Sequence, residues 1–362
     1  MGWSLTIGRI AGTDIRLHLT FLLFLVWIGL SDYLQRGTAA AVDSIVFMLL
    51  VFLCVALHEF GHIAMARHFG IRTPRVILSP IGGIASMERM PEKPRQELLV
   101  ALAGPLVNVV IALLLMALFG LGLSSITAIG FDTATLAERL LVVNVVLVLF
   151  NMVPAFPMDG GRVLRAVLAM NLGAPRATAL AARIGQGFAF LFVLLGLFYN
   201  PILIFVGVFI YFAAASEEQS ASFTGFASRL RVKDAMEPSP VLLLAEEPLS
   251  RAVDALLSSP QKEFPVIDQA GRIMGLLDRD AMIMGLRGQG AEATVGSAMR
   301  TSEPLLMEQP LVEAFTRMRS SGTRAEVVID AGGKVAGILT QENIAEMMMI
   351  ENARPGWRFT RR

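Results

Sequence analysis

The chain of 362 residues is long enough for two or three domains. Its composition, with 54% hydrophobic and 17% charged residues and a mean hydropathy of +0.62, excludes an average soluble protein and indicates a polytopic membrane protein. The single cysteine, Cys54, excludes an intrachain disulfide and a cysteine-based zinc finger. The net charge of +1 indicates no class of partner, and we expect no direct contact with nucleic acid.

The hydrophobic residues are concentrated in residues 1–215. Six apolar segments predict membrane spans, near residues 17–34, 44–66, 97–120, 138–155, 184–199 and 201–215. Residues 216–231 form a polar linker, residues 232–350 have the composition of a soluble α/β region, and residues 351–362 are a basic tail. We therefore expect an α-helical polytopic membrane domain of about six spans, followed by a soluble α/β module.

Basic residues alternate between the connections of these predicted spans. They are frequent before the first span, between the second and third, and between the fourth and fifth, whereas the opposite connections contain only Arg36 and Arg139. By the positive-inside rule, both termini and the soluble module are then cytoplasmic in a multi-pass protein of the cell membrane.

The segment His58-Glu59-Phe60-Gly61-His62 lies in the apolar run of residues 45–66, within the second predicted span. Residues four apart on a helix share a face, so the two histidines can hold one Zn²⁺ while Glu59 reaches a water molecule as general base. Ionisable groups are costly in hydrocarbon, and a metal site accounts for them better than a structural histidine pair does.

Two residues are candidates for a third metal ligand. His68 lies ten residues after His58, but the residues between them favour a continuous helix, which turns His68 away from the ligand face. Asp159 follows two prolines and precedes two glycines at the cytoplasmic end of the fourth span. We expect Asp159 to be the ligand, which leaves a fourth zinc position open for water. The alternative is a surface acid that caps the following helix.

Two asparagines lie within predicted spans, where a side-chain amide needs a partner. Asn108 and Asn151 are candidates for substrate clamping or oxyanion support, and interhelical hydrogen bonding is an equally good interpretation of each. Residues 76–85 contain two short β-like runs around a proline and paired glycines. We interpret them as a re-entrant hairpin beside the site, with a plain surface hairpin as the alternative.

The soluble region contains an internal repeat with an offset of about 62 residues. Residues 232–236 recur at 295–299, and residues 265–275 recur at 327–337. Each unit, about 232–290 and about 295–350, predicts a helix, two strands joined by a glycine turn, and a second helix. We expect the two copies to pack together, because each alone has little core.

With these motifs the chain resembles the site-2 protease family of intramembrane zinc metalloproteases. The resemblance covers residues 1–215 and rests on the segments His58–His62, Asn151–Gly161, Gly82-Gly83, Gly104–Asn108 and Gly12–His18. It implies an endopeptidase that hydrolyses peptide bonds in or near transmembrane segments, with one Zn²⁺ per chain. The implied substrate is a membrane-anchored protein such as a tethered transcriptional regulator.

The repeat is similar to a tandem cystathionine-β-synthase (CBS) pair, which is found on one branch of that family. In CBS domains generally, a nucleotide meets a Thr or Ser and an Asp three residues later; here Thr340 and Asn343 are the matching residues of the second unit. Asp278 stands at the first of these positions in the first unit and would repel phosphate. We expect at most one adenine-nucleotide site, and leave open gating by a ligand, a homodimer through the CBS domains, and a purely structural pair.

In the expected chemistry, Zn²⁺ polarises the scissile carbonyl and lowers the pKa of water, while Glu59 takes the water proton and delivers it to the leaving amine. The alternative function is a CBS-regulated metal-ion transporter or channel, in which the His and Asp residues bind a transported metal. Glu59 discriminates between the two functions, because a transport site has no need of a general base.

Overall fold

The computed structural model describes residues 4–10, 12–79, 82–86, 91, 93–122, 134–354, 357 and 359. The chain divides into two compact units, Met1–Ala221 and Ser222–Arg362, each of which we describe by itself.

The N-terminal unit is mainly helical. Its helices are α1 (Leu19–Arg36), α2 (Thr38–His68), α3 (Pro94–Phe119), α5 (Leu136–Asn151), α6 (Asp159–Leu172), α7 (Ala174–Phe198) and α8 (Ile202–Ala227), the last of which continues past the unit boundary. Among the described residues, the helices α2, α3, α7 and α8 are long and apolar enough to cross a membrane. Helices α1 and α5 occupy the other two predicted spans with 18 and 16 residues. The chain is thus a membrane protein, and the count of six spans stays approximate.

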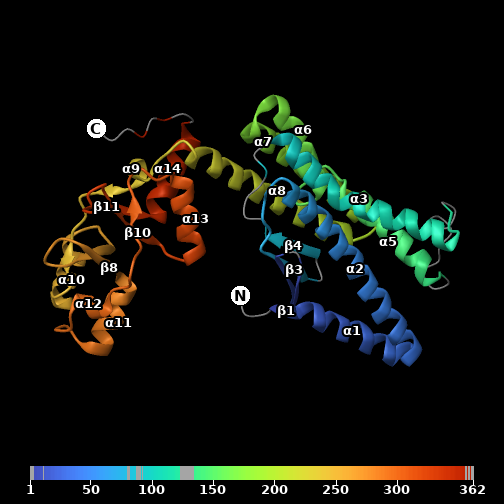
Figure 1. Cartoon of the computed structure of the whole chain (residues 1–362), viewed down its shortest axis with the longest axis horizontal. Helices are drawn as coiled ribbons and strands as arrows, with labels where there is room; N and C mark the ends of the chain where they lie inside the picture. The colour runs from blue at the N-terminus through green and yellow to red at the C-terminus, as the bar shows by residue number, and fades with distance from the viewer. Residues whose placement is uncertain are drawn as a thin grey trace. The chain divides into compact units, whose positions relative to one another are not determined.

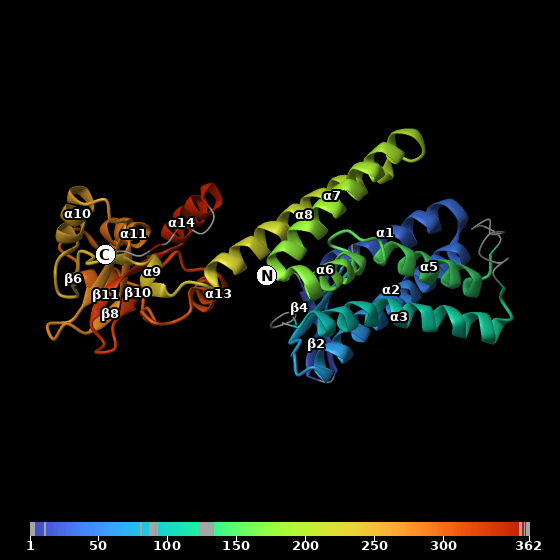
Figure 2. The ribbon, with the colours of Figure 1, turned by 90° about the horizontal axis from the view of Figure 1, so that it is seen from above.

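Helix α3 is the centre of this unit, because it packs against α2, α5 and α6. Figure 2 shows α2, α3 and α5 running side by side. Gly61 permits the close contact of α2 with α3, since a Cβ atom there would lie 2.6 Å from the carbonyl oxygen of Ala103. Small residues at such interfaces let helix backbones approach where lipid provides no hydrophobic driving force.

A four-stranded sheet accompanies the helices, and its strands are β1 (Ser4–Ile10), β2 (Thr13–His18), β3 (Arg75–Ser79) and β4 (Gly82–Ser86). The strand order is β1-β2-β3-β4, with β2 and β3 parallel and the other pairs antiparallel. Strands β3 and β4 are the two β-runs expected at residues 76–85, whereas no sequence pattern predicts the N-terminal hairpin of β1 and β2. The sheet lies against α2 (Figure 1), where Val76 and Ile63 are buried and the partly buried Phe60 packs against them.

Two segments that were expected to be connections are helical. The basic connection before the fifth span forms α6 and the first turns of α7, and α8 continues through most of the expected linker to Ala227. The linker residues Ser216–Ala221 include Glu, Gln and Ala, which have high helix propensity, so loss of apolar character does not end the helix. The fourth predicted span ends earlier than expected, at Asn151, because the residues before a proline disfavour helical backbone and Pro154 follows closely.

The C-terminal unit contains the two repeats. The first consists of α9 (Val232–Ala235), β5 (Glu237–Pro238), β6 (Leu243–Leu244), α10 (Leu249–Ser258), β7 (Glu263–Ile267), β8 (Ile273–Asp278) and α11 (Arg279–Gln289). The second consists of α12 (Val295–Ala298), β9 (Leu305–Leu306), α13 (Leu311–Ser321), β10 (Ala325–Ile329), β11 (Val335–Thr340) and α14 (Gln341–Ala353). The expected glycine turns are present at Gly271 and Gly333, with φ angles of 77° and 78°.

The two repeats are interlocked rather than merely adjacent. One sheet has the order β6-β7-β8, and the other has the order β5-β11-β10-β9, so β5 of the first repeat completes the sheet of the second. Leu276 of the first repeat is also buried together with Ala325, Val327 and Ile338 of the second. The expected packing of the two copies is therefore observed.

Candidate metal centre

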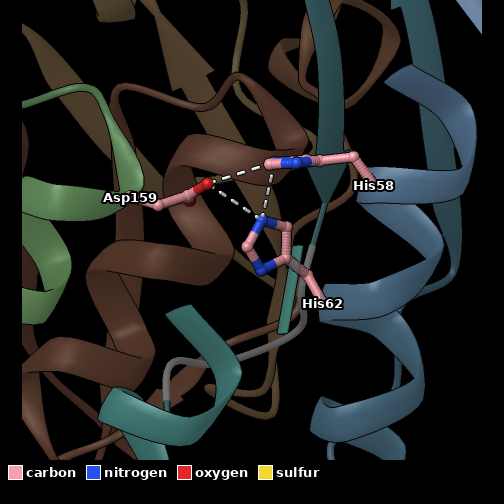
Figure 3. A group of neighbouring side chains, drawn as sticks. All are labelled: His58, His62 and Asp159. Carbon is pink, nitrogen blue, oxygen red and sulfur yellow. Dashed lines mark hydrogen bonds and ion pairs between the residues drawn. The ribbon is translucent and has the colours of Figure 1, made fainter. Parts of the chain in front are cut away.

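Three buried side chains from two helices converge at one point in the N-terminal unit (Figure 3). His58 Nε2 and His62 Nε2 lie 3.1 Å apart, and they lie 3.1 and 3.2 Å from Oδ2 of Asp159. Two zinc–ligand bonds of about 2.0–2.1 Å at a tetrahedral angle place the ligand atoms about 3.3 Å apart. The spacing of the three atoms therefore suits a single ion of this size.

The other nitrogen of each imidazole has a fixed partner. His62 Nδ1 donates to the carbonyl oxygen of Val100 at 2.7 Å, and His58 Nδ1 donates to Oδ1 of Asn108 at 2.5 Å. Each ring then carries its proton on Nδ1, and each Nε2 presents a lone pair to the other and to the Asp159 carboxylate. Two lone pairs and a carboxylate in contact repel one another unless a cation lies between them, so this donor set fits Zn²⁺.

A chain of hydrogen bonds explains why Asn108 accepts from His58 rather than donating to it. The carbonyl oxygen of Leu140 accepts from Nδ2 of Asn144 at 2.8 Å, and Oδ1 of Asn144 accepts from Nδ2 of Asn108 at 2.8 Å. Since a main-chain carbonyl can only accept, the direction of every bond in the chain follows from Leu140. Both asparagines are 0% exposed. The observed partners of Asn108 are thus interhelical, and Asn144 is a site residue that no sequence motif indicates.

Gly104 on α3 provides the space in which the two imidazoles lie. A Cβ atom at this position would lie 2.2 Å from His62 Nε2 and 2.8 Å from His58 Nε2. Any other residue would therefore displace one ring or occupy the position of the ion.

Asp159 is the first residue of α6, where the exposed main-chain N–H groups of a helix favour a negative charge. The two following glycines allow the start of α6 to pack directly on the turn before it. A Cβ atom at Gly160 would lie 2.3 Å from the carbonyl oxygen of Val153, and one at Gly161 would lie 2.6 Å from the carbonyl carbon of Ala155. The proline and glycine residues around Asp159 thus direct its carboxylate at the two histidines of α2.

Glu59 is adjacent to the ligands on α2 and is partly exposed, whereas His58, His62 and Asp159 are buried. Its carboxylate interacts electrostatically with both histidines, with Asp159 and with Arg162 of α6. A carboxylate that lies next to the three candidate ligands but outside their cluster is suited to the role of a general base.

The other candidates of the membrane domain lie outside this cluster. Helix α2 continues through His68, which is exposed and contacts the ring of Phe69. Asn151 is the last residue of α5 and is half-buried, and its side chain forms no hydrogen bond with the residues that the structure describes. The structure thus brings together His58, His62 and Asp159 but does not bring Asn151 to them.

In the C-terminal unit, Thr340 and Asn343 lie at the start of α14. Thr340 Oγ1 accepts from the main-chain N–H of Asn343 at 3.0 Å and donates to Asn343 Oδ1 at 2.5 Å, so the pair caps the helix. Asn343 also lines a cavity of about 660 Å³, together with Asp234, Ala235, Glu237, Pro238, Glu346, Met347, Ile350, Trp357 and Phe359. In the first repeat, Asp278 caps α11 in the same way by accepting from the N–H of Ala281.

Comparison with known proteins decides the family. Residues 46–139 and 125–195 match the model of peptidase family M50, and residues 232–288 and 295–350 each match the CBS domain. The zinc metalloprotease MJ0392 of Methanocaldococcus jannaschii is 32% identical over 97% of both chains. The chain belongs to peptidase family M50, the site-2 proteases.

A second relative agrees with this assignment, and one solved structure is similar to part of the chain. The putative zinc metalloprotease Rip3 of Mycobacterium tuberculosis is 30% identical over 99% of this chain and 96% of its own length. The structure of the site-2 protease from Methanocaldococcus jannaschii is 36% identical over 60% of this chain and 95% of its own, with a TM-score of 0.44. The chain is therefore a zinc metalloprotease with a transmembrane domain and a tandem CBS module, as the resemblance of its motifs implied.

Proposed function

We propose that this protein is an intramembrane endopeptidase that hydrolyses peptide bonds in or near the transmembrane segments of membrane-tethered proteins. One observation supports the proposal above others. Two histidines from α2 and an aspartate from α6 converge at one point, and Glu59 lies beside them outside the cluster. Helix α2, which carries both histidines and Glu59, is apolar enough to cross a membrane. His58, His62 and Asp159 are the proposed zinc ligands, and Glu59 is the proposed catalytic base.

The residues of the chain divide the chemistry between them. When bound, Zn²⁺ supplies Lewis-acid polarisation of the scissile carbonyl and lowers the pKa of water. Glu59 removes the proton of the attacking water and transfers it to the nitrogen of the leaving amine, so no proton is gained or lost overall. Asn108 and Asn144 hold His58 in the tautomer that leaves Nε2 free.

The substrate must also be presented as an extended strand, because the amides of a transmembrane helix are already paired. Strand β4 is at one end of the order β1-β2-β3-β4, and the sheet packs on the segment of α2 that carries the ligands. We propose that the substrate adds to β4 as a further strand. Replacing residues 82–86 with a flexible Gly-Ser segment should then reduce turnover and leave the zinc content unchanged; unchanged turnover would refute strand addition.

The transporter alternative finds no support in the membrane domain. It explains the two histidines and Asp159, but it gives no role to Glu59, and the domain matches a peptidase model. In a transporter, loss of the Glu59 carboxylate would leave the function intact.

The test of the proposed function is cleavage of co-expressed, tagged single-span membrane proteins by the wild type and by Glu59→Gln. We expect cleavage to depend on Glu59, with a loss of at least a hundredfold, and both proteins to retain one zinc per chain. Metal flux into liposomes is the parallel measurement. Flux that survives Glu59→Gln, without cleavage of any substrate, would support the transporter instead.

For the CBS unit we propose a regulatory role, with an adenine nucleoside or nucleotide bound beside Asn343. The cavity at Asn343 has an aromatic wall, Trp357 and Phe359, suited to a base, but its carboxylates oppose a phosphate chain. Calorimetric titration of the full-length protein with adenosine and ATP, using Asn343→Leu as the control, would test this. We expect adenosine to bind more tightly than ATP in the absence of Mg²⁺, and no binding to either protein would contradict the proposal.

A further inference from the structure

A buried arginine on the helix of Asp159 joins that helix to two others. Arg165 lies on α6, and its side chain is 11% exposed. Its Nε and Nη2 atoms lie 2.6 and 2.5 Å from Oε1 of Glu97 on α3, and its Nη1 donates to Oε1 of Glu217 on α8 at 2.8 Å. Three helices therefore meet at one guanidinium group.

The same guanidinium also contacts the turn that precedes Asp159. Its Cζ atom lies 5.6 Å from the centre of the Phe156 ring, and Phe156 is 2% exposed. Phe156 precedes the ligand by three residues and Arg165 follows it by six. Arg165 thus holds the chain on both sides of Asp159.

The carboxylate of Glu97 connects this arrangement to the other two ligands. Glu97 lies in the first turn of α3, the helix whose Val100 carbonyl accepts from His62 and whose Gly104 leaves room for both rings. The pair of Arg165 with Glu97 therefore joins the helix of Asp159 to the helix that contacts both histidines.

The carboxylate of Glu217 connects Arg165 to α8, the helix along which the chain continues into the CBS unit. Helix α8 runs without interruption from Ile202 to Ala227. Beyond Glu217, Phe226 and Ala227 are buried in the core of the second repeat, and the ring of Phe223 packs on that of Phe315. Arg165 thus contacts the helix along which the chain leaves the N-terminal unit.

We propose that Arg165 is a positioning residue of the metal centre, which holds Asp159 at ligand distance from His58 and His62, and that Glu217 extends this hold to α8. The planar guanidinium serves two carboxylates and one aromatic ring at once, which the single ammonium group of a lysine does not. The proposal rests on the proposed function only in taking the cluster as a metal site, and it does not require proteolysis.

The test measures Co²⁺ affinity and the visible Co²⁺ absorption spectrum of the full-length protein in detergent. The variants are Arg165→Lys, Glu217→Gln and the double variant, with Arg176→Gln, an exposed arginine on α7, as the matched control. We expect Arg165→Lys to weaken Co²⁺ binding about ten- to a hundredfold, the usual effect of losing a residue that orients a metal ligand. The spectrum should change as well, because Asp159 would lie differently relative to the two histidines. Glu217→Gln should weaken binding severalfold, and the double variant should bind no more weakly than Arg165→Lys, because the two residues act through one contact.

The outcomes separate this proposal from the proposed function. Glu217 is 37% exposed, so its variant tests the idea even where a change at buried Arg165 prevents folding. Wild-type Co²⁺ affinity in Arg165→Lys and Glu217→Gln overturns the proposal, whatever the effect on cleavage. If the wild type binds Co²⁺ but cleaves nothing, the proposed function fails while the positioning role stands on the affinity data.

Discussion

The two imidazoles of the metal centre are held by acceptors of different kinds. His62 donates to a main-chain carbonyl, that of Val100, which no side-chain substitution removes. His58 depends on the side chain of Asn108, whose own orientation depends on Asn144. His58 is therefore the ligand whose orientation is the more sensitive to mutation, although neither asparagine contacts the ion.

Substitution of Asn144 by leucine should consequently weaken metal binding. Without the Oδ1 atom of residue 144, the Asn108 amide is free to rotate and present its NH₂ group to His58, which favours the tautomer with the proton on Nε2. We expect about a tenfold rise in the zinc dissociation constant, measured by competition with a chelator. Asn171→Leu, at an exposed asparagine on α6, is the control; equal affinities of the two variants would show that Asn144 does not act on His58.

The residues of the site differ in how far sequence alone identifies them. The spacing of His58, Glu59 and His62 predicts a zinc site with a general base. The prolines and glycines around Asp159 predict a sharp turn that exposes its carboxylate to a ligand. Asn144 has neither, because a single asparagine in an apolar helix indicates only that some partner exists. Its partner lies on a helix distant in sequence, and nothing in the spacing of residues 108 and 144 predicts their contact.

At the scale of elements, the hairpin of α7 and α8 depends on small residues. A Cβ atom at Gly207 of α8 would lie 2.6 Å from the carbonyl oxygen of Ala189 on α7, and one at Gly196 would lie 2.6 Å from Ile204 Cγ1. The contact at Gly207 is with the main chain, which cannot move aside as a side chain can. The two helices can approach this closely only with glycine at residue 207.

We therefore expect Gly207→Ala to destabilise the membrane domain by about 1–3 kcal/mol, the usual cost of overpacking. The measurement is thermal unfolding in detergent. Gly187→Ala on α7 is the matched control, because a Cβ atom there meets nothing within 4 Å; it should raise stability slightly through better helix propensity. If the Gly207→Ala protein were as stable as this control, the close contact of α7 with α8 would make no net contribution to stability.

Elements with a strong apolar period were predicted well, and those that depend on distant pairing were not. The apolar runs that form α2 and α3 predict their helices by themselves. The N-terminal strands β1 and β2 are short and half polar, and β2 pairs in parallel with β3, which lies some 60 residues further along the chain. Helix α6 differs from the prediction for another reason: arginines between two apolar runs indicate a connection, but here Arg165 is buried and paired.

At the scale of the whole molecule, the orientation in the membrane is a prediction of the basic residues alone. It can be tested with single cysteines, because the one native cysteine, Cys54, is buried. We expect a membrane-impermeant maleimide to label Thr38→Cys, at the start of α2, in intact cells, and to label Ser320→Cys, on α13 of the CBS unit, only after the cells are opened. Both positions are exposed. The reverse pattern would place the CBS unit outside the cytoplasm.

Strand β5 belongs to the first repeat but pairs with β11 of the second, which limits where the chain can be cut into stable fragments. A fragment that begins at residue 295 contains all the helices of the second repeat but lacks β5, so the edge of β11 is left with unpaired main-chain groups. An uncovered edge strand readily pairs with another chain, which leads to aggregation or to exchange of segments between molecules. The second repeat therefore cannot be transplanted to another protein without the segment of the first repeat that contains β5.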